Sequence, residues 1–237
     1  MENSTYTTLT RQTGLVREMQ VVANNIANAA TTGYRQEGLV FSEYVQELND
    51  DSSLSMATAR VRNTSMLQGA LTQTESTFDF GIEGPGFFLV DTPSGERLTR
   101  SGNFSPNADG DLVTNDGYRV LDGGGAPVFI PPGASDLSVA VDGTISTDGQ
   151  AVGQIGLFVP TDPNSLNRED GVMFQTDSGI DPADNARIVQ GFLEDSNVDP
   201  ISQIARMIEV QRAYEMGQSF LQSEDERIRT ALSAMTK

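Results

Sequence analysis

Residues 207–235, MIEVQRAYEMGQSFLQSEDERIRTALSAM, decide the fold of this chain, because their apolar residues recur at the spacing of a coiled-coil helix. No proline interrupts residues 201–237, so the stretch predicts one long helix that follows Pro200. An apolar stripe on a terminal helix needs a partner to cover it. Five residues of the stripe are seven apart: Met207, Tyr214, Leu221, Ile228 and Met235. Val210 and Ala231 fall at intermediate positions.

The N-terminus carries a matching stripe. Leu9, Val16 and Ala23 are seven apart, and Met19 and Ile26 fall at the intermediate positions. We expect a helix over residues 4–32 that ends at Gly33, because glycine accepts the left-handed conformation of a helix C-cap. The partners that we expect for each terminal helix are the other terminus and neighbouring copies of the chain.

The middle of the chain has a different composition. All ten prolines and 18 of the 23 glycines fall within residues 81–200. Residues 87–90, FFLV, predict a buried strand, and a turn at 92–95 returns the chain into a second strand at 97–100. Residues 109–117 and 142–149 form a partial internal repeat, and the Asp-Gly pairs at the ends of each copy predict hairpins.

These patterns predict an α+β protein. Its N- and C-terminal α-helices form a coiled-coil-type layer, and its β-rich middle domain consists of short antiparallel strands and hairpins. The predicted divisions are an N-terminal helix (1–33), a linking segment (34–80), a β-rich outer domain (81–170), a returning linking segment (171–199) and a C-terminal helix (200–237).

Charge and composition exclude several classes of function. The net charge is −18, yet residues 1–35 sum to +1 and residues 200–237 to zero, so the excess lies in the middle of the chain. No basic stripe exists for nucleic acid or an anionic membrane. The chain contains no cysteine and no histidine, and we expect no catalytic residues, metal or cofactor. We also expect no cleaved Sec signal, because residues 1–10 lack a basic and an apolar region, and no membrane span.

Two loops invite a ligand but favour a simpler interpretation. Residues 107–111, NADGD, alternate oxygen-bearing side chains, but the glycine and glutamate of a calcium-binding EF-hand loop are missing from their required positions. Gly84 and Gly86 lack the lysine and helix that follow a phosphate-binding glycine loop. We favour a hairpin turn for the first loop and a bend into a buried strand for the second.

Residues 23–35, ANNIANAATTGYR, contain three asparagines within five positions, and asparagine is a poor helix former. Asn25 and Asn28 are three residues apart and therefore share a helix face. A fraying helix end would explain them. Hydrogen bonds between packed helices explain them better, because Ile26 keeps the apolar register.

This segment resembles the axial proteins of the bacterial flagellum, whose rod and hook members carry Asn-Asn-aliphatic-Ala-Asn-x-x-Thr-x-Gly-Tyr/Phe-Lys/Arg near the N-terminus. The resemblance continues in family order at residues 84–88, 98–104, 110–117, 196–199 and 207–215, so it covers nearly the whole chain. Residues 120–132 and 142–146 look most like the proximal rod members, with the distal rod members as the alternative.

The resemblance implies a structural subunit of the basal-body rod that polymerises through its terminal helices and transmits motor torque across the periplasm for swimming. It implies as partners other copies of the chain, other rod proteins and the flagellar type III export machinery, with a chaperone as a further candidate. It implies export without a cleaved signal peptide. The predicted subunit-interface residues are Leu9, Val16, Met19, Ala23, Asn24, Asn25, Ile26, Asn28, Gly33, Tyr34, Met207, Val210, Gln211, Arg212, Tyr214, Leu221, Ile228, Ala231 and Met235.

An alternative of another class is a secreted acidic β-domain enzyme or binding module with helical ends. The absence of tryptophan and histidine argues against it, because sugar-binding faces usually present large aromatic side chains.

Overall fold

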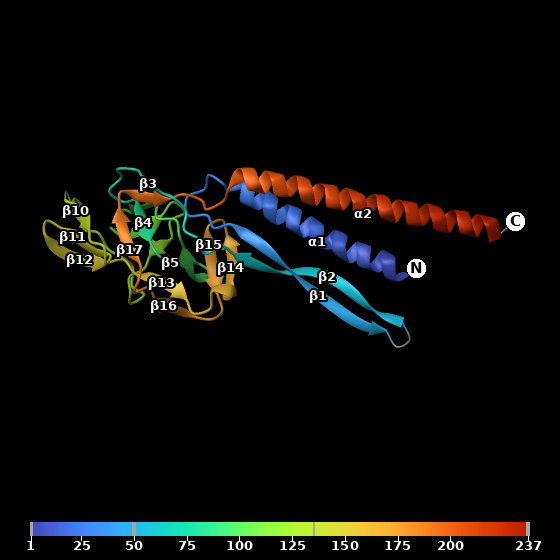
Figure 1. The fold of residues 1–237 in the computed structure, drawn as a ribbon. Helices are drawn as coiled ribbons and strands as arrows, with labels where there is room; N and C mark the ends of the chain where they lie inside the picture. The colour runs from blue at the N-terminus through green and yellow to red at the C-terminus, as the bar shows by residue number, and fades with distance from the viewer. Residues whose placement is uncertain (1, 49–50, 135, 236–237) are drawn as a thin grey trace. The chain divides into compact units, whose positions relative to one another are not determined.

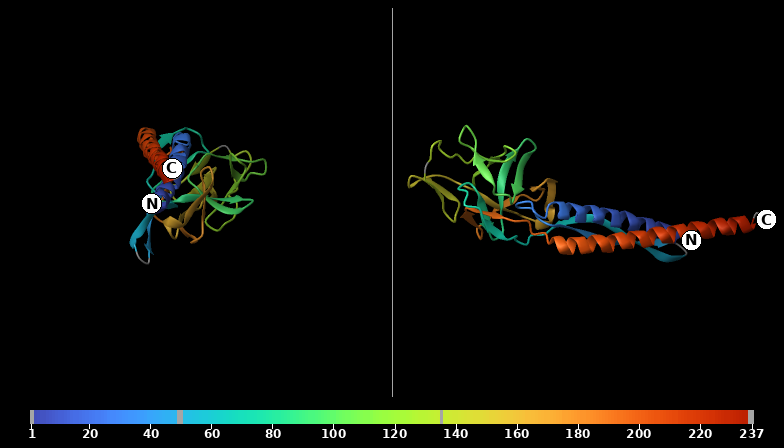
Figure 2. Two further views of the ribbon diagram at one scale, coloured as in Figure 1. Left: turned by 90° about the vertical axis from the view of Figure 1, so that its right-hand side faces the viewer. Right: turned by 90° about the horizontal axis from the view of Figure 1, so that it is seen from above.

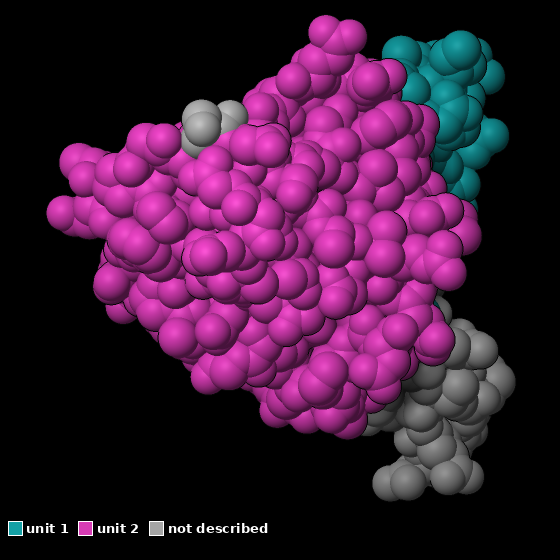
Figure 3. All heavy atoms as spheres, turned by 90° about the vertical axis from the view of Figure 1, so that its left-hand side faces the viewer, with its two compact units in different colours: residues 1–27, 37–63, 199–237 teal, residues 28–36, 64–198 magenta. Residues whose placement is uncertain are grey.

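The computed structural model describes residues 2–48, 51–134 and 136–235. Two long helices, α1 (Glu2–Ala27) and α2 (Pro200–Met235), stand at the ends of the chain, and strands fill the middle (Figure 1). The chain divides into two compact units, coloured separately in Figure 3. Unit 1 comprises residues 1–27, 37–63 and 199–237, and unit 2 comprises residues 28–36 and 64–198.

The strands are short apart from the first two. Their bounds are β1 (Glu37–Leu48), β2 (Asp51–Thr64), β3 (Leu71–Gln73), β4 (Phe80–Glu83), β5 (Phe87–Thr92), β6 (Gly95–Thr99), β7 (Phe104–Pro106), β8 (Leu112–Thr114), β9 (Arg119–Val120), β10 (Leu137–Val139), β11 (Thr144–Thr147), β12 (Gln150–Gln154), β13 (Leu157–Pro160), β14 (Leu166–Asp170), β15 (Met173–Thr176), β16 (Ile180–Pro182), β17 (Arg187–Gln190) and β18 (Phe192–Glu194), with a 3-10 turn at Pro163–Ser165.

Unit 1 consists of the two helices and the β1–β2 hairpin. The helices lie side by side in each of the views in Figures 1 and 2. Helix α2 begins at Pro200, as predicted, and the side chain of Asp199 caps it by accepting a hydrogen bond from the backbone N–H of Ile201 (3.1 Å).

Helix α1 ends at Ala27, five residues before the predicted end. The chain then makes a turn in which the backbone N–H of Thr31 donates to the carbonyl of Asn28 and Thr31 Oγ1 donates to its side chain. Asparagine and threonine side chains compete with the helix for backbone partners in this way. Gly33 has a φ of +69°, so the predicted left-handed glycine is present, but it follows this turn rather than the last helical residue.

Unit 2 is built around a nine-stranded antiparallel sheet with the order β14-β15-β6-β5-β9-β8-β7, which β13 and β16 join through β5. Strand β5 lies in the middle, paired to β6, β9 and β13. Strands β17 and β18, which come from the end of this unit's sequence, pair with β4 and β3 from its beginning. The pairs β17–β4 and β18–β3 therefore join the last strands of unit 2 to its first.

The predicted buried strand at residues 87–90 separates two hydrophobic clusters. Phe88 and Val90 belong to one cluster, and Phe87 and Leu89 belong to the other, so β5 is buried on both faces. The ring of Phe88 packs edge-on against Phe104, with centroids 5.1 Å apart. A continuous apolar run, rather than an alternating one, is typical of such a strand.

Both copies of the internal repeat form the central strand of a three-stranded meander. Strand β8 lies between β7 and β9, and β11 lies between β10 and β12. The glycines of the Asp-Gly turns, Gly110, Gly117, Gly143 and Gly149, all have positive φ angles between 77° and 91°. The predicted tight turns are confirmed at each end of both copies.

The α+β prediction is confirmed, with a helix at each end and a strand-rich middle. The helices contact each other, whereas their pairing as a coiled coil stays a prediction, as do the five predicted divisions of the chain. The predicted linking segment 34–80 is shared between the two units. In the described ranges, neither helix has a stretch apolar enough to cross a membrane.

Candidate functional site

The contact between α1 and α2 in unit 1 combines buried apolar residues with polar side chains. Gln12 Nε2 donates to the backbone carbonyl of Tyr214 (3.0 Å). The Glu18 carboxylate accepts from Arg206 Nε (2.7 Å) and Nη2 (2.5 Å), and Glu18 raises the pKa of that guanidinium. These long side chains tie the two helices together at defined positions, so they set the register of the pair.

Asn25 completes this contact. Its side-chain amide bonds both backbone groups of Glu37, the carbonyl at 2.8 Å and the N–H at 3.0 Å, and also donates to Gln203 Oε1 of α2 (3.1 Å). The predicted hydrogen bonding of asparagine between packed helices is confirmed at Asn25. Asn28, the second asparagine of that prediction, instead accepts from Thr31 in the turn after α1.

The buried face of α1 is shifted by one residue from its predicted stripe. Leu15, Glu18, Val22 and Asn25 are buried at alternating steps of three and four residues, which is the spacing of a packed helix seam. The predicted positions Leu9, Val16 and Ala23 are exposed instead. They belong to a second face of α1 that nothing covers within the described residues of unit 1.

On α2 the predicted stripe coincides with the packed face only over its first half. Val210 is 2% exposed, and Met207, Tyr214 and Leu221 are half-buried. The exposed fraction then rises to 45% at Ile228, 59% at Leu232 and 84% at Met235. The packed seam therefore opens toward the C-terminus.

The predicted interface residues fall into three groups by exposure. The buried residues are Asn25, Gly33, Tyr34 and Val210; the half-buried ones are Met19, Ile26, Asn28, Met207, Tyr214 and Leu221; and the exposed ones are Leu9, Val16, Ala23, Asn24, Gln211, Arg212, Ile228, Ala231 and Met235. Gly33 and Tyr34 belong to unit 2, where they pack inside the unit.

Unit 2 contains a buried cluster of two arginines and one glutamate. Glu194 accepts from Arg100 Nε through one carboxylate oxygen (2.5 Å), and its other oxygen lies 3.2 Å from Arg35 Nη2 and accepts from the backbone N–H of Gly69 (2.9 Å). The three side chains are 3% exposed or less. Three segments distant in the sequence therefore meet at one carboxylate.

Arg100 also binds the backbone around the first glycine turn. Its guanidinium donates to the carbonyls of Ile82 and Gly84 (both 2.8 Å) and to that of Gly86. Arg100 thus supplies donors to three carbonyls of one bend, of which that of Ile82 also accepts from Gln68 Nε2 (3.0 Å). The bend predicted at Gly84 and Gly86 is thus stabilised by Arg100, which directly follows β6. The glycines of this loop are explained by the bend and do not require a bound phosphate.

Burial lowers the pKa of Arg35 to about 10, although the Glu194 carboxylate opposes the shift. Burial also lowers the pKa of Arg100. Arg35 Nη1 donates to the Leu67 carbonyl, while its Nε has no hydrogen-bond partner. Nearby, the Arg168 guanidinium lies between two rings, 4.2 Å from the Tyr34 centroid and 4.6 Å from that of Phe174.

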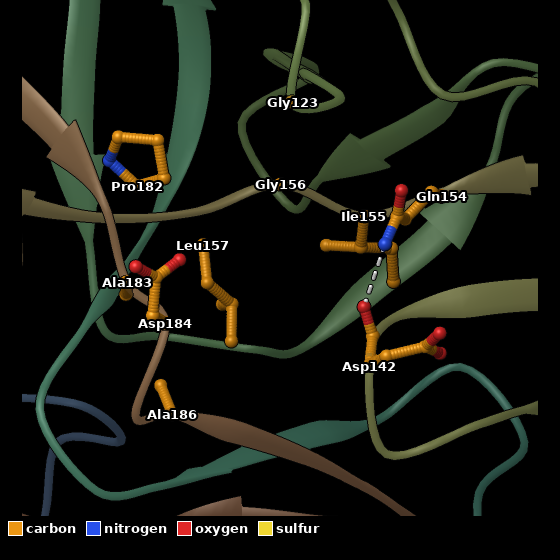
Figure 4. Close-up of a pocket in the computed structure, with 10 residues that line it drawn as sticks. All are labelled: Gly123, Asp142, Gln154, Ile155, Gly156, Leu157, Pro182, Ala183, Asp184 and Ala186. Carbon is orange, nitrogen blue, oxygen red and sulfur yellow. Dashed lines mark hydrogen bonds between the residues drawn. The ribbon is translucent and has the colours of Figure 1, made fainter.

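No arrangement for catalysis is found among the described residues. The pocket in Figure 4 has a volume of about 340 Å³, and its polar contacts include a hydrogen bond from Gln154 to the Asp142 carbonyl (2.9 Å). In the described part of the chain, no three acidic, cysteine or histidine side chains gather as a metal site. The loop 107–111 is held by the Asn107 side chain, which accepts from the N–H groups of Asp109 and Asp111.

Most of the residues that make these polar contacts were not predicted from the sequence. Gln12, Glu18 and Arg206 are polar, so the apolar stripes do not indicate them. Arg35 lies in the segment 23–35 and Arg100 in the segment 98–104, both of which resemble the family. Each arginine is next to residues predicted to be buried, and a charged residue in such a position is usually paired. Glu194 could not be identified as their partner because 94 residues separate it from Arg100.

Comparison with known proteins accounts for most of the chain. Three family models match: "Flagella basal body rod protein" at residues 6–35, "Flagellar hook protein FlgE/F/G D1 domain" at 81–147 and "Flagellar basal body rod FlgEFG protein C-terminal" at 189–234. Each matched segment contributes one member of the buried cluster, Arg35, Arg100 and Glu194 in turn.

Individual relatives cover the chain from end to end. The flagellar basal-body rod protein FlgF of Caulobacter vibrioides is 38% identical over 100% of this chain and 99% of its own length. FlgF of Mesorhizobium japonicum is 37% identical over 97% and 98%, and the rod protein FlgG of Bacillus subtilis is 30% identical over 95% and 96%. These relatives are structural proteins rather than enzymes. The chain belongs to the flagellar basal-body rod protein family.

Proposed function

We propose that this chain is a structural subunit of the flagellar basal-body rod, of the FlgF type, and that it assembles with other copies and other rod proteins through α1 and α2. The observation that carries the proposal is the helix pair of unit 1, because it leaves apolar side chains exposed on both helices. Leu9, Val16, Ile228 and Leu232 are among them. Exposed apolar stripes of this length typically mark a protein–protein contact.

The polar seam supports the same role. A rod that transmits torque needs subunits whose helices keep their register under load. Glu18–Arg206, Asn25–Gln203 and Gln12–Tyr214 fix that register by hydrogen bonds between named atoms. Apolar packing without such contacts would allow the helices to slide, because it is non-directional.

Identity to relatives favours the FlgF type over the FlgG type. FlgF proteins match at 34–38% identity, whereas the FlgG proteins match at 28–31%. We propose further that the subunit reaches the rod through the flagellar type III apparatus, with a chaperone as a further candidate partner, and lies in the periplasmic part of the basal body. Family membership is what supports the export route and the location.

The test compares two chains in cells that lack the native protein. The full chain restores swimming and is recovered in purified basal bodies, whereas a chain that ends at Val198 and so lacks α2 is absent from them. Protease resistance of the truncated chain checks that unit 2 is folded. Recovery of the folded, truncated chain in basal bodies at the normal level would disprove assembly through the helix pair.

A further inference from the structure

We propose that the C-terminal turns of α2, residues 225–235, dock onto an isoleucine patch at the start of α2 in a second copy of this chain. The patch consists of Ile201, Ile204 and Ile208. Repetition of this contact joins helix pairs head to tail. The inference rests on the proposed assembly function and adds which two surfaces meet.

The C-terminal turns extend beyond their partner helix. Helices α1 and α2 are antiparallel, since Asn25 bonds Gln203 and Gln12 bonds the Tyr214 carbonyl. Both helices rise about 1.5 Å per residue, so Glu2 lies opposite about residue 224 of α2. Figures 1 and 2 show α1 beginning well short of the C-terminal end of α2. Residues 225–235 therefore have no part of α1 beside them.

The apolar face of these turns continues the packed seam. Ile228, Leu232 and Met235 lie on the same side of α2 as the buried Val210, because a helix turns 100° per residue. They are 45%, 59% and 84% exposed. Of the charges in and beside these turns, Glu224 pairs with Arg227 (2.6 Å) and Asp225 with Arg229 (2.9 Å), and Glu226 lies on the opposite side of the helix. An apolar partner can thus approach this end without separating or burying an unpaired charge.

The isoleucine patch lies on the opposite side of α2, where it is turned away from α1. Ile201, Ile204 and Ile208 recur at steps of three and four residues and are 79%, 50% and 44% exposed. Each surface spans eight residues, or about 11 Å, and presents three large apolar side chains. The two surfaces therefore match in length and in chemistry.

The position of the two surfaces indicates a second copy as the partner. They lie at opposite ends of α2 and on opposite faces, so one copy can use both at the same time. A contact between two different surfaces of identical subunits is heterologous, and it produces an open, growing assembly unless it closes into a ring. That is the kind of contact that a rod requires.

Cysteine cross-linking tests the contact directly, since the full-length chain contains no cysteine. Leu232→Cys and Ile204→Cys are introduced into one chain, which is treated with a short bis-maleimide at a concentration where sedimentation shows self-association. We expect a ladder of dimers, trimers and larger products. Each single-cysteine chain should remain monomeric, because its cysteine has no second cysteine beside it in the contact, and a mixture of the two chains should give mixed dimers. A double-cysteine chain that stops at the dimer, or does not cross-link while it associates, would overturn the proposal.

Charge substitutions separate this inference from the proposed function. Leu232→Glu and Ile204→Glu should each reduce incorporation into basal bodies at least about tenfold, because a carboxylate would be buried in the contact. The matched controls Thr230→Glu and Ser202→Glu place the same charge on other exposed faces and should be incorporated normally. If both Leu232→Glu and Ile204→Glu enter basal bodies normally while the chain that ends at Val198 does not, the docking is wrong and the proposed function stands.

Discussion

At the scale of single residues, Glu194 holds the buried cluster of unit 2 together. It supplies the carboxylate between Arg35 and Arg100, and all three side chains are buried. A buried charge is tolerated only when it is paired and hydrogen-bonded. Glu194 therefore compensates two cations that would otherwise oppose folding, and it joins the beginning, middle and end of unit 2 in doing so.

Glu194→Gln should destabilise unit 2 by about 3–5 kcal/mol, because the amide leaves two buried guanidinium groups without a counter-charge. Urea unfolding followed by circular dichroism measures the change. The control is Asp91→Asn, which removes a carboxylate from Arg119 in an ion pair that is exposed on both sides and should have little effect. Equal midpoints for the two variants would show that the buried cluster adds nothing to stability.

Gly33 is restricted both by its backbone angle and by its neighbours. Its φ is +69°, and a Cβ atom there would lie 2.3 Å from the backbone nitrogen of Ser101. Gly117 has a similar angle, +86°, but open space around it. Substitutions at Gly33 and Gly117 therefore distinguish the cost of backbone strain, which both share, from the cost of a clash with a neighbouring segment, which only Gly33 has.

We expect Gly117→Ala to cost roughly 1 kcal/mol, which is the cost of a positive φ for a residue with a Cβ atom. Gly33→Ala should cost clearly more, because the chain at Ser101 must also move. Thermal unfolding of the two variants provides the comparison. Similar melting temperatures would mean that the backbone at Gly33 relaxes without loss of packing.

At the scale of elements, the pairing of α1 with α2 depends on a seam that combines apolar and polar residues. Leu221 is half-buried in the seam, between the buried Val210 and the exposed C-terminal turns. A charge introduced at Leu221 therefore lies near the end of the region in which α1 and α2 run side by side.

Leu221→Asp should abolish swimming and incorporation into the rod while unit 2 stays folded, because packing the helices would bury an unpaired carboxylate at a cost of several kcal/mol. Motility in soft agar and analysis of purified basal bodies measure the effect. Gln222→Asp adds the same charge one residue away, on an exposed face, and should behave like the unmodified chain. Normal swimming by the Leu221→Asp strain would mean that this part of the seam does not serve assembly.

At the scale of the whole molecule, unit 2 contains every member of its buried cluster. A fragment of residues 28–198 includes Arg35, Arg100 and Glu194. It also includes all the strands that pair within unit 2, from β3 to β18. The shorter fragment 37–198 retains those strands but lacks Gly33, Tyr34 and Arg35.

We expect fragment 28–198 to fold on its own with a cooperative thermal transition. Fragment 37–198 should melt at a lower temperature, because Glu194 and Arg168 lose Arg35 and Tyr34 as partners. Circular dichroism melts of the two purified fragments test this. Identical transitions would show that residues 28–36 contribute nothing to the stability of unit 2.

Periodicity and turn chemistry in the sequence by themselves determined the helix at each end, the β-rich middle and the turns of the internal repeat. These features depend on neighbours along the chain, and so a local pattern is enough to predict them. The same patterns indicated the packed face of α2 as far as Leu221.

Only the tertiary structure decided which face of α1 is buried, where α1 ends and how the charged residues pair. The buried face includes Glu18 and Asn25, polar residues that satisfy their hydrogen bonds on α2 and at Glu37 and therefore belong to a seam that apolar spacing alone misplaces by one position. Arg35, Arg100 and Glu194 are far apart in the sequence. Their pairing follows from strand pairs that bring the two ends of unit 2 together, and no local pattern contains that information.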